Sequence, residues 1–393
     1  MKERIQQSFE IRTPKIELAV DLIIGIYRSR EVSSTSLARH VCTEAETSSK
    51  LRRIERFYQQ EYIDSESLIN AIRRMYGEKK FRLSLDRTNW EFGKKELNAF
   101  AAFASSGNTG SLINLKMLDN KGGNSCSDDR IEIVEGIVKQ YGKDSILSIL
   151  GDREFYSLKF AGWLKSEGIG FAIRVKENLD FVQAYLKGAT VKGKTFKGVI
   201  AGTYEEVEVR CDLSIKKLKD EYLIIASSRV ARPLEEYRGR WGIERFFKML
   251  KTGGFNIEST KITDPDRLEI LFLLCSMAYL ICVKMGVYRH EQIKKMRKKP
   301  RDGCYEYSFF RWGLDWLREL IFPDIYRKRM AEYLLFRSKK RCHIQLRSTR
   351  TRDVPNDCSR YQTMGRDYRG FSKEPVKCDG LYERSWSCQI KFI

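Results

Sequence analysis

The segment YRGRWGIERFFKMLK, residues 237–251, has the spacing of an amphipathic helix. At about 100° per residue, four of its reactive or phosphate-seeking side chains fall within an arc of roughly 60°: Tyr237, Arg240, Glu244 and Lys251. Apolar side chains point to the other side: Ile243, Phe246, Met249 and Leu250. A carboxylate held beside cations suits chemistry on a polyanion, because Glu244 can bind a metal ion while the cations bind phosphate. The alternative is an ordinary helix with a solvated charged face.

Two aspartates follow apolar segments elsewhere in the chain. FRLSLDRTNWEFG, residues 81–93, places Asp86 directly after alternating leucines. DSILSILGDREF, residues 144–155, places Asp152 just past a run of aliphatic residues. Each pattern predicts a short buried strand that carries a carboxylate at its end. Taken alone, each aspartate is better explained as a residue that favours the turn after a strand.

Together the three segments resemble motifs of the insertion-sequence-four family of bacterial DDE transposases. The spacing Tyr-x2-Arg-x3-Glu-x6-Lys is met at every position, LDRTNW matches the motif of the first aspartate, and GDREF matches that of the second. The resemblance covers residues 15–325. The residues that it implies are catalytic are Asp86, Asp152 and Glu244. The residues that it implies contact DNA, at phosphates near the cleaved end and at a flipped base, are Tyr237, Arg240 and Lys251. Trp241 can stack on that base or pack in the core.

Three carboxylates suit phosphodiester hydrolysis by two divalent ions. The reaction needs an activated water and relief of charge on the leaving oxygen, and two hard cations supply both. Mg²⁺ prefers carboxylate oxygens and takes further ligands from phosphate. We therefore expect two Mg²⁺ ions, for which Mn²⁺ can substitute, with Asp86 as the shared ligand and Asp152 and Glu244 each completing one site. The three histidines lie outside these motifs, which argues against a histidine-based nuclease or a zinc hydrolase.

Residues 79–288 are predicted to form a mixed α/β catalytic core. A helix is expected over residues 129–141, and strands are expected over residues 82–85, 97–104, 111–117, 146–150 and 170–175. The order of three strands, helix, strand, helix and strand resembles the ribonuclease-H-like fold of these transposases, although residues 94–118 are more polar and less β-rich than is usual in the family. Residues 179–225 alternate like antiparallel strands around glycine turns, which resembles the family's β insertion ahead of the catalytic Glu.

Three other segments flank this core. Residues 1–78 show helical spacing with polar turns, where Ser33 or Ser34 can cap the middle helix, and the resemblance makes this part a helical DNA-binding domain. The arginines assigned there to DNA contact, or alternatively to solvent, are Arg52, Arg53 and Arg56. Residues 289–335 combine a basic linker with a C-terminal amphipathic helix over residues 308–320. Residues 336–393 show no sustained periodicity and are interpreted as an atypical tail, either disordered or frameshifted.

The composition fits a protein that handles nucleic acid. The 73 Lys and Arg residues outnumber the 52 Asp and Glu residues, and the net charge of +21 favours nucleic acid or an anionic membrane as a partner. No secretion signal is visible, and the apolar segment 270–283 is too short for a convincing membrane span, so we expect a buried helix there and no membrane partner. The ten cysteines form no CxxC pair, which favours reduced thiols in a cytosolic protein.

The resemblance implies cut-and-paste transposition of an insertion sequence by metal-dependent phosphodiester hydrolysis and strand transfer. A homodimer would pair the two element ends, free a 3′ hydroxyl at each, form a hairpin, and join the reopened end to target DNA. The expected partner is double-stranded DNA, as terminal inverted repeats and as target, and the expected location is the bacterial cytoplasm, in association with the nucleoid. The alternative is a decayed transposase that binds element ends only as a repressor. A ribonuclease H or resolvase-type nuclease would share the metal site but not the Tyr-Arg-Glu-Lys helix.

Overall fold

The structure is a computed structural model that describes residues 13–41, 45–60, 63–92, 95–118, 125–177, 182–183, 195–204, 207–218, 221–301 and 303–321. These residues divide into two compact units, one that runs to Lys295 and resumes at Ser308, and one within residues 296–307. In the second unit, Lys298 and Tyr305 form an antiparallel bridge. The predicted tail, residues 336–393, lies outside the described residues.

Four helices form the N-terminal part of the first unit. They are α2 (Thr13–Ser29), α3 (Ser34–His40), α4 (Thr47–Tyr58) and α5 (Ser65–Tyr76). Ser33 caps α3, because its side chain accepts a hydrogen bond from the backbone amide of Ser36. Gly77 ends α5 in the left-handed region, with φ 68°, where a residue without a Cβ is favoured. The prediction of helices in this segment is confirmed.

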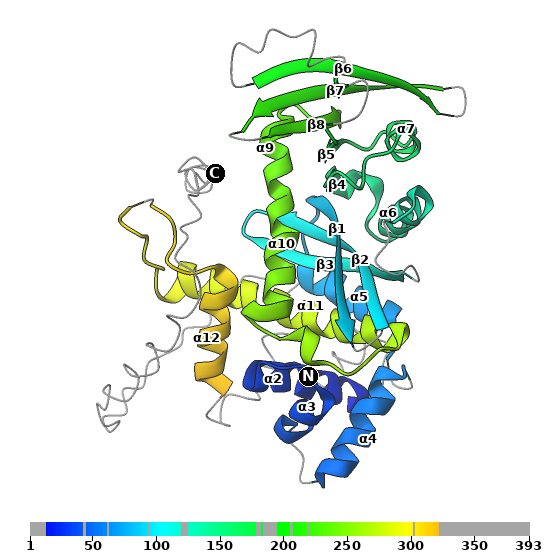
Figure 1. The fold of residues 1–393 in the computed structure, drawn as a ribbon. Helices are drawn as coiled ribbons and strands as arrows, with labels where there is room; N and C mark the ends of the chain where they lie inside the picture. Colours follow the sequence, from blue (N-terminus) through cyan, green and yellow to red (C-terminus); the bar gives the residue numbers. More distant parts are fainter. Residues whose placement is uncertain are drawn as a thin grey trace. The chain divides into compact units, whose positions relative to one another are not determined.

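An eight-stranded sheet forms the centre of the first unit, with the strand order β3-β2-β1-β4-β5-β8-β7-β6 (Figure 1). The strands are β1 (Phe81–Phe92), β2 (Lys95–Ser106), β3 (Thr109–Leu118), β4 (Ile146–Gly151), β5 (Phe171–Arg174), β6 (Thr195–Tyr204), β7 (Val207–Lys217) and β8 (Tyr222–Ser228). Strands β1 to β3 pair antiparallel, whereas β4 runs parallel to both β1 and β5. Strands β5, β8, β7 and β6 pair antiparallel in that order. The five predicted core strands, and strands in the predicted β insertion, are therefore present.

Strands β2 and β3 form in spite of the low β propensity of their sequence. Residues 97–104 of β2 are buried without interruption, which explains the run of alanines and phenylalanines better than propensity does. Phe103 contacts Phe246 and Tyr279 on one face of the sheet. Phe100 stacks on Phe155 on the other face, with ring centroids 5.6 Å apart. Burial on both faces thus decides the conformation of this segment.

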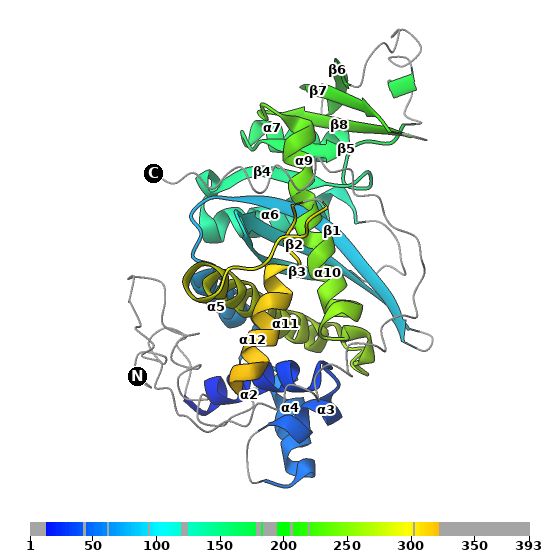
Figure 2. The ribbon, with the colours of Figure 1, turned by 90° about the vertical axis from the view of Figure 1, so that its left-hand side faces the viewer.

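Helices cover both faces of the sheet (Figure 2). One face carries α6 (Ser127–Tyr141) and α7 (Leu158–Ser166), which contact each other. The other face carries α10 (Trp241–Lys248) and α11 (Pro265–Tyr288). Helix α12 (Phe309–Ile321) packs on α11 and confirms the C-terminal helix predicted over residues 308–320. Short helical turns lie at η1 (Lys143–Ser145), η4 (Ile257–Ser259) and the π-helical η5 (Arg289–Ile293).

Helix α11 is the buried helix predicted over residues 270–283. The helical stretch Pro265–Ile293 is long and apolar enough to cross a membrane, but 89% of its most apolar window is buried inside the protein. The N-terminal helices contact it directly. Tyr27 Oη donates a hydrogen bond of 3.0 Å to Ala278 O, and Lys284 Nζ donates one of 3.0 Å to Tyr76 O. Helix α11 therefore links the N-terminal helices to the sheet.

Candidate active site

The segment Tyr237–Lys251 is helical, but it is not the single regular helix that the spacing predicts. It consists of the end of α9 (Pro233–Tyr237), the 3₁₀ turn η2 (Arg238–Arg240), α10 and the π-helical turn η3 (Met249–Gly253). Gly239 lies against β1, where a Cβ would come within 3.0 Å of Arg82 Cδ. The 3₁₀ and π turns change the angle per residue, so the 60° stripe is not continuous from end to end. The apolar back of this segment is buried as predicted at Ile243, Phe246 and Leu250.

The two aspartates are brought together by the parallel pairing of β1 with β4. The last pair between the two strands is Leu85 with Gly151, so Asp86 and Asp152 each directly follow a member of this pair. Asp152 lies just past β4 as predicted, in a turn closed by a 2.9 Å bond from Phe155 N to Asp152 O. Asp86, in contrast, lies within β1 and not at its end, because pairing with β2 continues the strand to Phe92.

Arg240 lies at the centre of the predicted residues. Its Nη1 is 3.2 Å from Asp86 Oδ2, and its Nη2 also donates to Glu244 Oε1. Arg240 Nε donates to Tyr237 Oη at 3.1 Å, and Tyr237 Oη in turn donates to Asp152 Oδ1 at 3.2 Å. One guanidinium and one phenol therefore connect all three carboxylates, which come from β1, the turn after β4 and α10.

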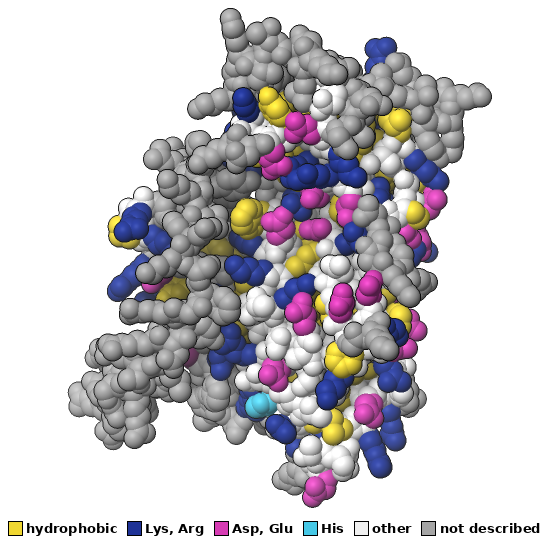
Figure 3. Space-filling model, viewed as in Figure 1, with side chains coloured by type: hydrophobic (Ala, Val, Ile, Leu, Met, Phe, Trp, Pro, Cys, Tyr) yellow, Lys and Arg dark blue, Asp and Glu magenta, His cyan; other side chains and the backbone are white. Residues whose placement is uncertain are grey.

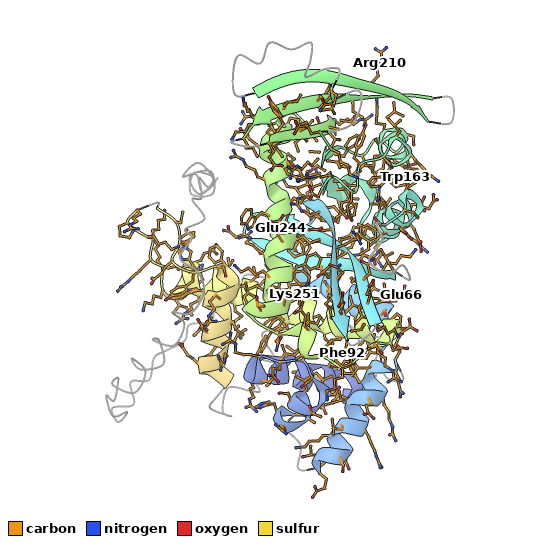
Figure 4. The ribbon with its side chains drawn as sticks, in the orientation of Figure 1. Glu66, Phe92, Trp163, Arg210, Glu244 and Lys251 are labelled. Carbon is orange, nitrogen blue, oxygen red and sulfur yellow. The ribbon has the colours of Figure 1, made fainter. Side chains whose placement is uncertain are left out.

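Lys251 lies away from this group. Its Nζ donates a hydrogen bond of 2.9 Å to Asn89 O and pairs with Glu258 Oε1 at 3.1 Å. Figure 4 shows it farther along the helical segment than Glu244. Lys251 lies within the π-helical turn η3, where the angle per residue differs from that of an α-helix, so a side chain expected on the same stripe is directed to a different part of β1.

Trp241 lies next to Arg240 and is exposed, with 47% of its surface accessible. The alternative that Trp241 packs in the core is therefore wrong. The aromatic ring lies at the surface, as the base-stacking alternative requires. Figure 3 shows acidic and basic side chains close together on this face of the molecule.

The pKa of Asp86 is raised to about 6, chiefly by burial and to a smaller extent by the nearby carboxylates of Glu244 and Asp152, against the lowering effects of Arg240 and of the Arg87 backbone amide. Burial also lowers the pKa of Arg240, but Tyr237, Glu244 and Asp86 raise it by more, so the guanidinium stays charged. Burial raises the pKa of Tyr237, so its hydroxyl keeps the proton that it donates. Arg240 thus pairs directly with two of the three acids, which leaves the cluster acidic.

Several residues that support this cluster were missed by the sequence analysis. Glu236 accepts two bonds from Arg82, of 2.7 and 3.1 Å, and one of 2.6 Å from Ser148 Oγ. It thereby fixes α9, and with it Tyr237, to β1 and β4. Arg174 on β5 lies 4.0 Å from Asp152 Oδ1 and pairs with Glu221 at 2.7 Å. The only sequence signal for Glu236 was its place beside Tyr237.

Residues 85–281 match the transposase DDE domain family, over half of the chain, and this span includes all three acids. The chain belongs to this family. It is also similar to a solved structure of the piggyBac transposase synaptic complex with hairpin DNA, at 12% identity and a TM-score of 0.44, over 82% of this chain and 75% of that chain. No curated protein matches the sequence.

The acidic cluster of this DDE transposase has the donors that hard divalent cations require. Asp86 and Glu244 contact the guanidinium of Arg240 directly, and Asp152 is linked to it through Tyr237 Oη. With that guanidinium between them, no group of three or more His, Cys, Asp or Glu side chains in the described ranges is arranged to hold a metal ion. In donor chemistry and in charge, the three acids fit Mg²⁺ or Mn²⁺.

Proposed function

We propose that this transposase moves an insertion sequence of the insertion-sequence-four type by cutting and rejoining DNA at the element ends. The observation that carries the proposal is the convergence of Asp86, Asp152 and Glu244 around Arg240 in a chain of the transposase DDE domain family. The agreement of the Tyr-x2-Arg-x3-Glu-x6-Lys spacing with the family signature supports the subgroup.

The proposed core is ribonuclease-H-like. The strand order β3-β2-β1-β4-β5, with an antiparallel meander followed by two parallel strands, supports this assignment. The helices α6 and α7 make the connections to the parallel strands, as such connections require. In this arrangement Asp86 lies in β1, Asp152 directly follows the adjacent strand β4, and α10 brings Glu244 to the same face.

The proposed cofactors are two Mg²⁺ ions, or Mn²⁺, held by Asp86 as the shared ligand and by Asp152 and Glu244 at one site each. Bound there, the ions supply an activated water and relieve charge on the leaving oxygen. Arg240 now neutralises Asp86 and Glu244. When the carboxylates ligate metal, its donors are released for phosphate oxygens, with which a guanidinium forms paired, charge-assisted bonds. Tyr237 then stays hydrogen-bonded to Asp152, and Lys251 contacts phosphate farther along the helical segment.

The proposed partner is double-stranded DNA, first at the terminal inverted repeats and then at the target. The net charge of +21 supports it, as do the exposed Arg52 and Arg56 on α4 of the proposed helical DNA-binding domain. Two copies of the chain would pair the two element ends, and cleavage through a hairpin would complete cut-and-paste movement. We place the protein in the bacterial cytoplasm, at the nucleoid.

The test is strand nicking by Asp86→Asn on a duplex that carries the inverted repeat found beside the gene. We expect Mg²⁺-dependent nicking to fall at least a hundredfold, because a metal ligand is lost, while DNA binding in a gel-shift assay stays within about twofold. Asp144→Asn, which changes an exposed aspartate, is the matched control and should nick like the parent. Nicking by Asp86→Asn at the parental rate would refute the assignment. Binding without nicking by the parent, in Mg²⁺ and in Mn²⁺, would instead favour the decayed repressor.

A further inference from the structure

An ion pair lies on the opposite face of the sheet from the acidic cluster. Arg87, the residue after Asp86, donates from Nε to Glu154 Oε1 at 2.6 Å and from Nη2 to Glu154 Oε2 at 2.7 Å. Its Nη1 also donates to Asn98 Oδ1 at 3.3 Å. The Arg87 and Glu154 side chains are only 14% and 22% exposed. Both belong to the two aspartate motifs, but the proposed chemistry gives neither of them a role.

Strand geometry explains why this pair lies behind the acids. Successive side chains of a strand point to opposite faces, so Asp86 and Arg87 diverge. Asp86 faces Arg240 of the helical segment that covers one side. Arg87 is opposite Phe100 in β2, which stacks on Phe155 on the other side. Arg87 therefore does not reach the side on which the three carboxylates meet.

The turn that begins at Asp152 is held by side-chain contacts, among them those of Asp152 with Tyr237 and Arg174. Asp152 follows the last paired residue of β4 and begins a turn, so no strand pairing holds it. Behind it, Phe155 is fully buried against Phe100, and Glu154 makes the bidentate contact with Arg87. The side-chain contact between Arg87 and Glu154 thus links the strand at Asp86 to the turn that begins at Asp152.

We propose that Arg87 and Glu154 form a positioning pair, which holds the turn after β4 so that the carboxylates of Asp86 and Asp152 keep the separation needed to share metal ions. The proposal rests on the proposed function of these two aspartates. A paired, planar contact restrains both distance and angle, which a single contact does not. Supporting residues of this kind commonly change metal affinity 10- to 100-fold when they are removed.

The sign of the charge effect separates this role from a general electrostatic one. Arg87→Gln removes a positive charge close to the cluster, so Coulomb attraction alone predicts that a divalent cation binds the variant more tightly. A positioning role predicts the opposite, because Glu154 loses its partner and the turn loses its restraint. Glu154→Gln lowers affinity under either explanation, so Arg87→Gln is the decisive variant.

The experiment is isothermal titration calorimetry, in which the full chain is titrated with Mn²⁺ alone. We expect Arg87→Gln and Arg87→Lys to bind Mn²⁺ about tenfold more weakly than the parent. The exchanged pair Arg87→Glu with Glu154→Arg should recover part of the loss. Glu167→Gln is the matched control, since Glu167 also pairs with a cation from another element, Lys143, at 3.1 Å, but this pair precedes β4 and β5 whereas Asp152 follows β4. Each variant is first compared with the parent by thermal melting, and Arg87→Lys provides the test if Arg87→Gln does not fold.

The outcomes distinguish the pair from the function on which it rests. If Asp86→Asn abolishes Mn²⁺ binding while both Arg87 variants bind as tightly as the parent or more tightly, the positioning role is wrong and the proposed site stands. If Asp86→Asn leaves Mn²⁺ binding unchanged, the proposed function fails, and the positioning role fails with it.

Discussion

Replacement of Asp86 by Asn should stabilise the metal-free protein at neutral and alkaline pH. Burial raises the pKa of Asp86 from its ordinary value, 3.8, to about 6, so the folded protein holds a proton that the unfolded chain has already released. The free energy of unfolding therefore falls as the pH rises from about 4 to 6, and the full loss remains above that range. Because a tenfold difference in proton affinity between the folded and unfolded chain is worth about 1.4 kcal/mol, the buried charge costs roughly 2–3 kcal/mol at pH 8.

The assay is urea unfolding of the parent and of Asp86→Asn in EDTA, at pH 5 and at pH 8. Asn has no charge to bury, and Arg240 keeps Glu244 and Tyr237 as partners, so the variant should gain about 2 kcal/mol at pH 8 and about half as much at pH 5. Asp144→Asn, at an exposed position, should change neither value. If Asp86→Asn is no more stable than the parent at pH 8, or if its advantage is the same at both pH values, the argument from burial is wrong.

Two further predictions concern the helical segments. Arg240→Ala should nick an element end but form hairpins at least tenfold more slowly, because a guanidinium that positions phosphate is lost while the three acids remain; hairpin formation at the parental rate, measured on denaturing gels, would contradict this. Gly313→Ala should destabilise the contact between α11 and α12 by about 2 kcal/mol or more, since the added Cβ would lie 1.8 Å from Cys282 O. Gly136→Ala, where the added Cβ meets only the end of the Asn114 side chain at 3.3 Å, is its control, and equal melting temperatures for the two variants would refute the packing argument.

Much of the fold was predictable because its elements carry local signals. Ile146, Ile149 and Leu150 of the aliphatic run before Asp152 are buried in β4, although Leu147 is exposed, and the leucines before Asp86 are buried in β1. The apolar segment 270–283 became the buried helix α11. Residues 94–118 gave the weakest signal, because their strand conformation depends on burial between two layers of helices and not on the propensity of alanine and polar residues.

The candidate site was predictable in composition but not in arrangement. The motifs pointed to Asp86, Asp152 and Glu244 as one group, and the structure brings them together around Arg240. They did not show that Arg240 would contact the acids, because a contact between side chains depends on how α10 packs on β1. Lys251 was expected on the same stripe, but no local pattern predicted the π-helical turn in which it lies.

By itself, the amino-acid sequence determined the order of strands and helices, the identity of the three acids and the strong positive charge, since each is a property of residue type and spacing. Only the tertiary structure decided that Leu85 pairs with Gly151, which makes Asp86 and Asp152 neighbours, and that Arg87 meets Glu154 behind them. These contacts join residues more than sixty positions apart. Strand register is set by the burial of whole faces of a sheet, so it exists only when all the packed elements are in place.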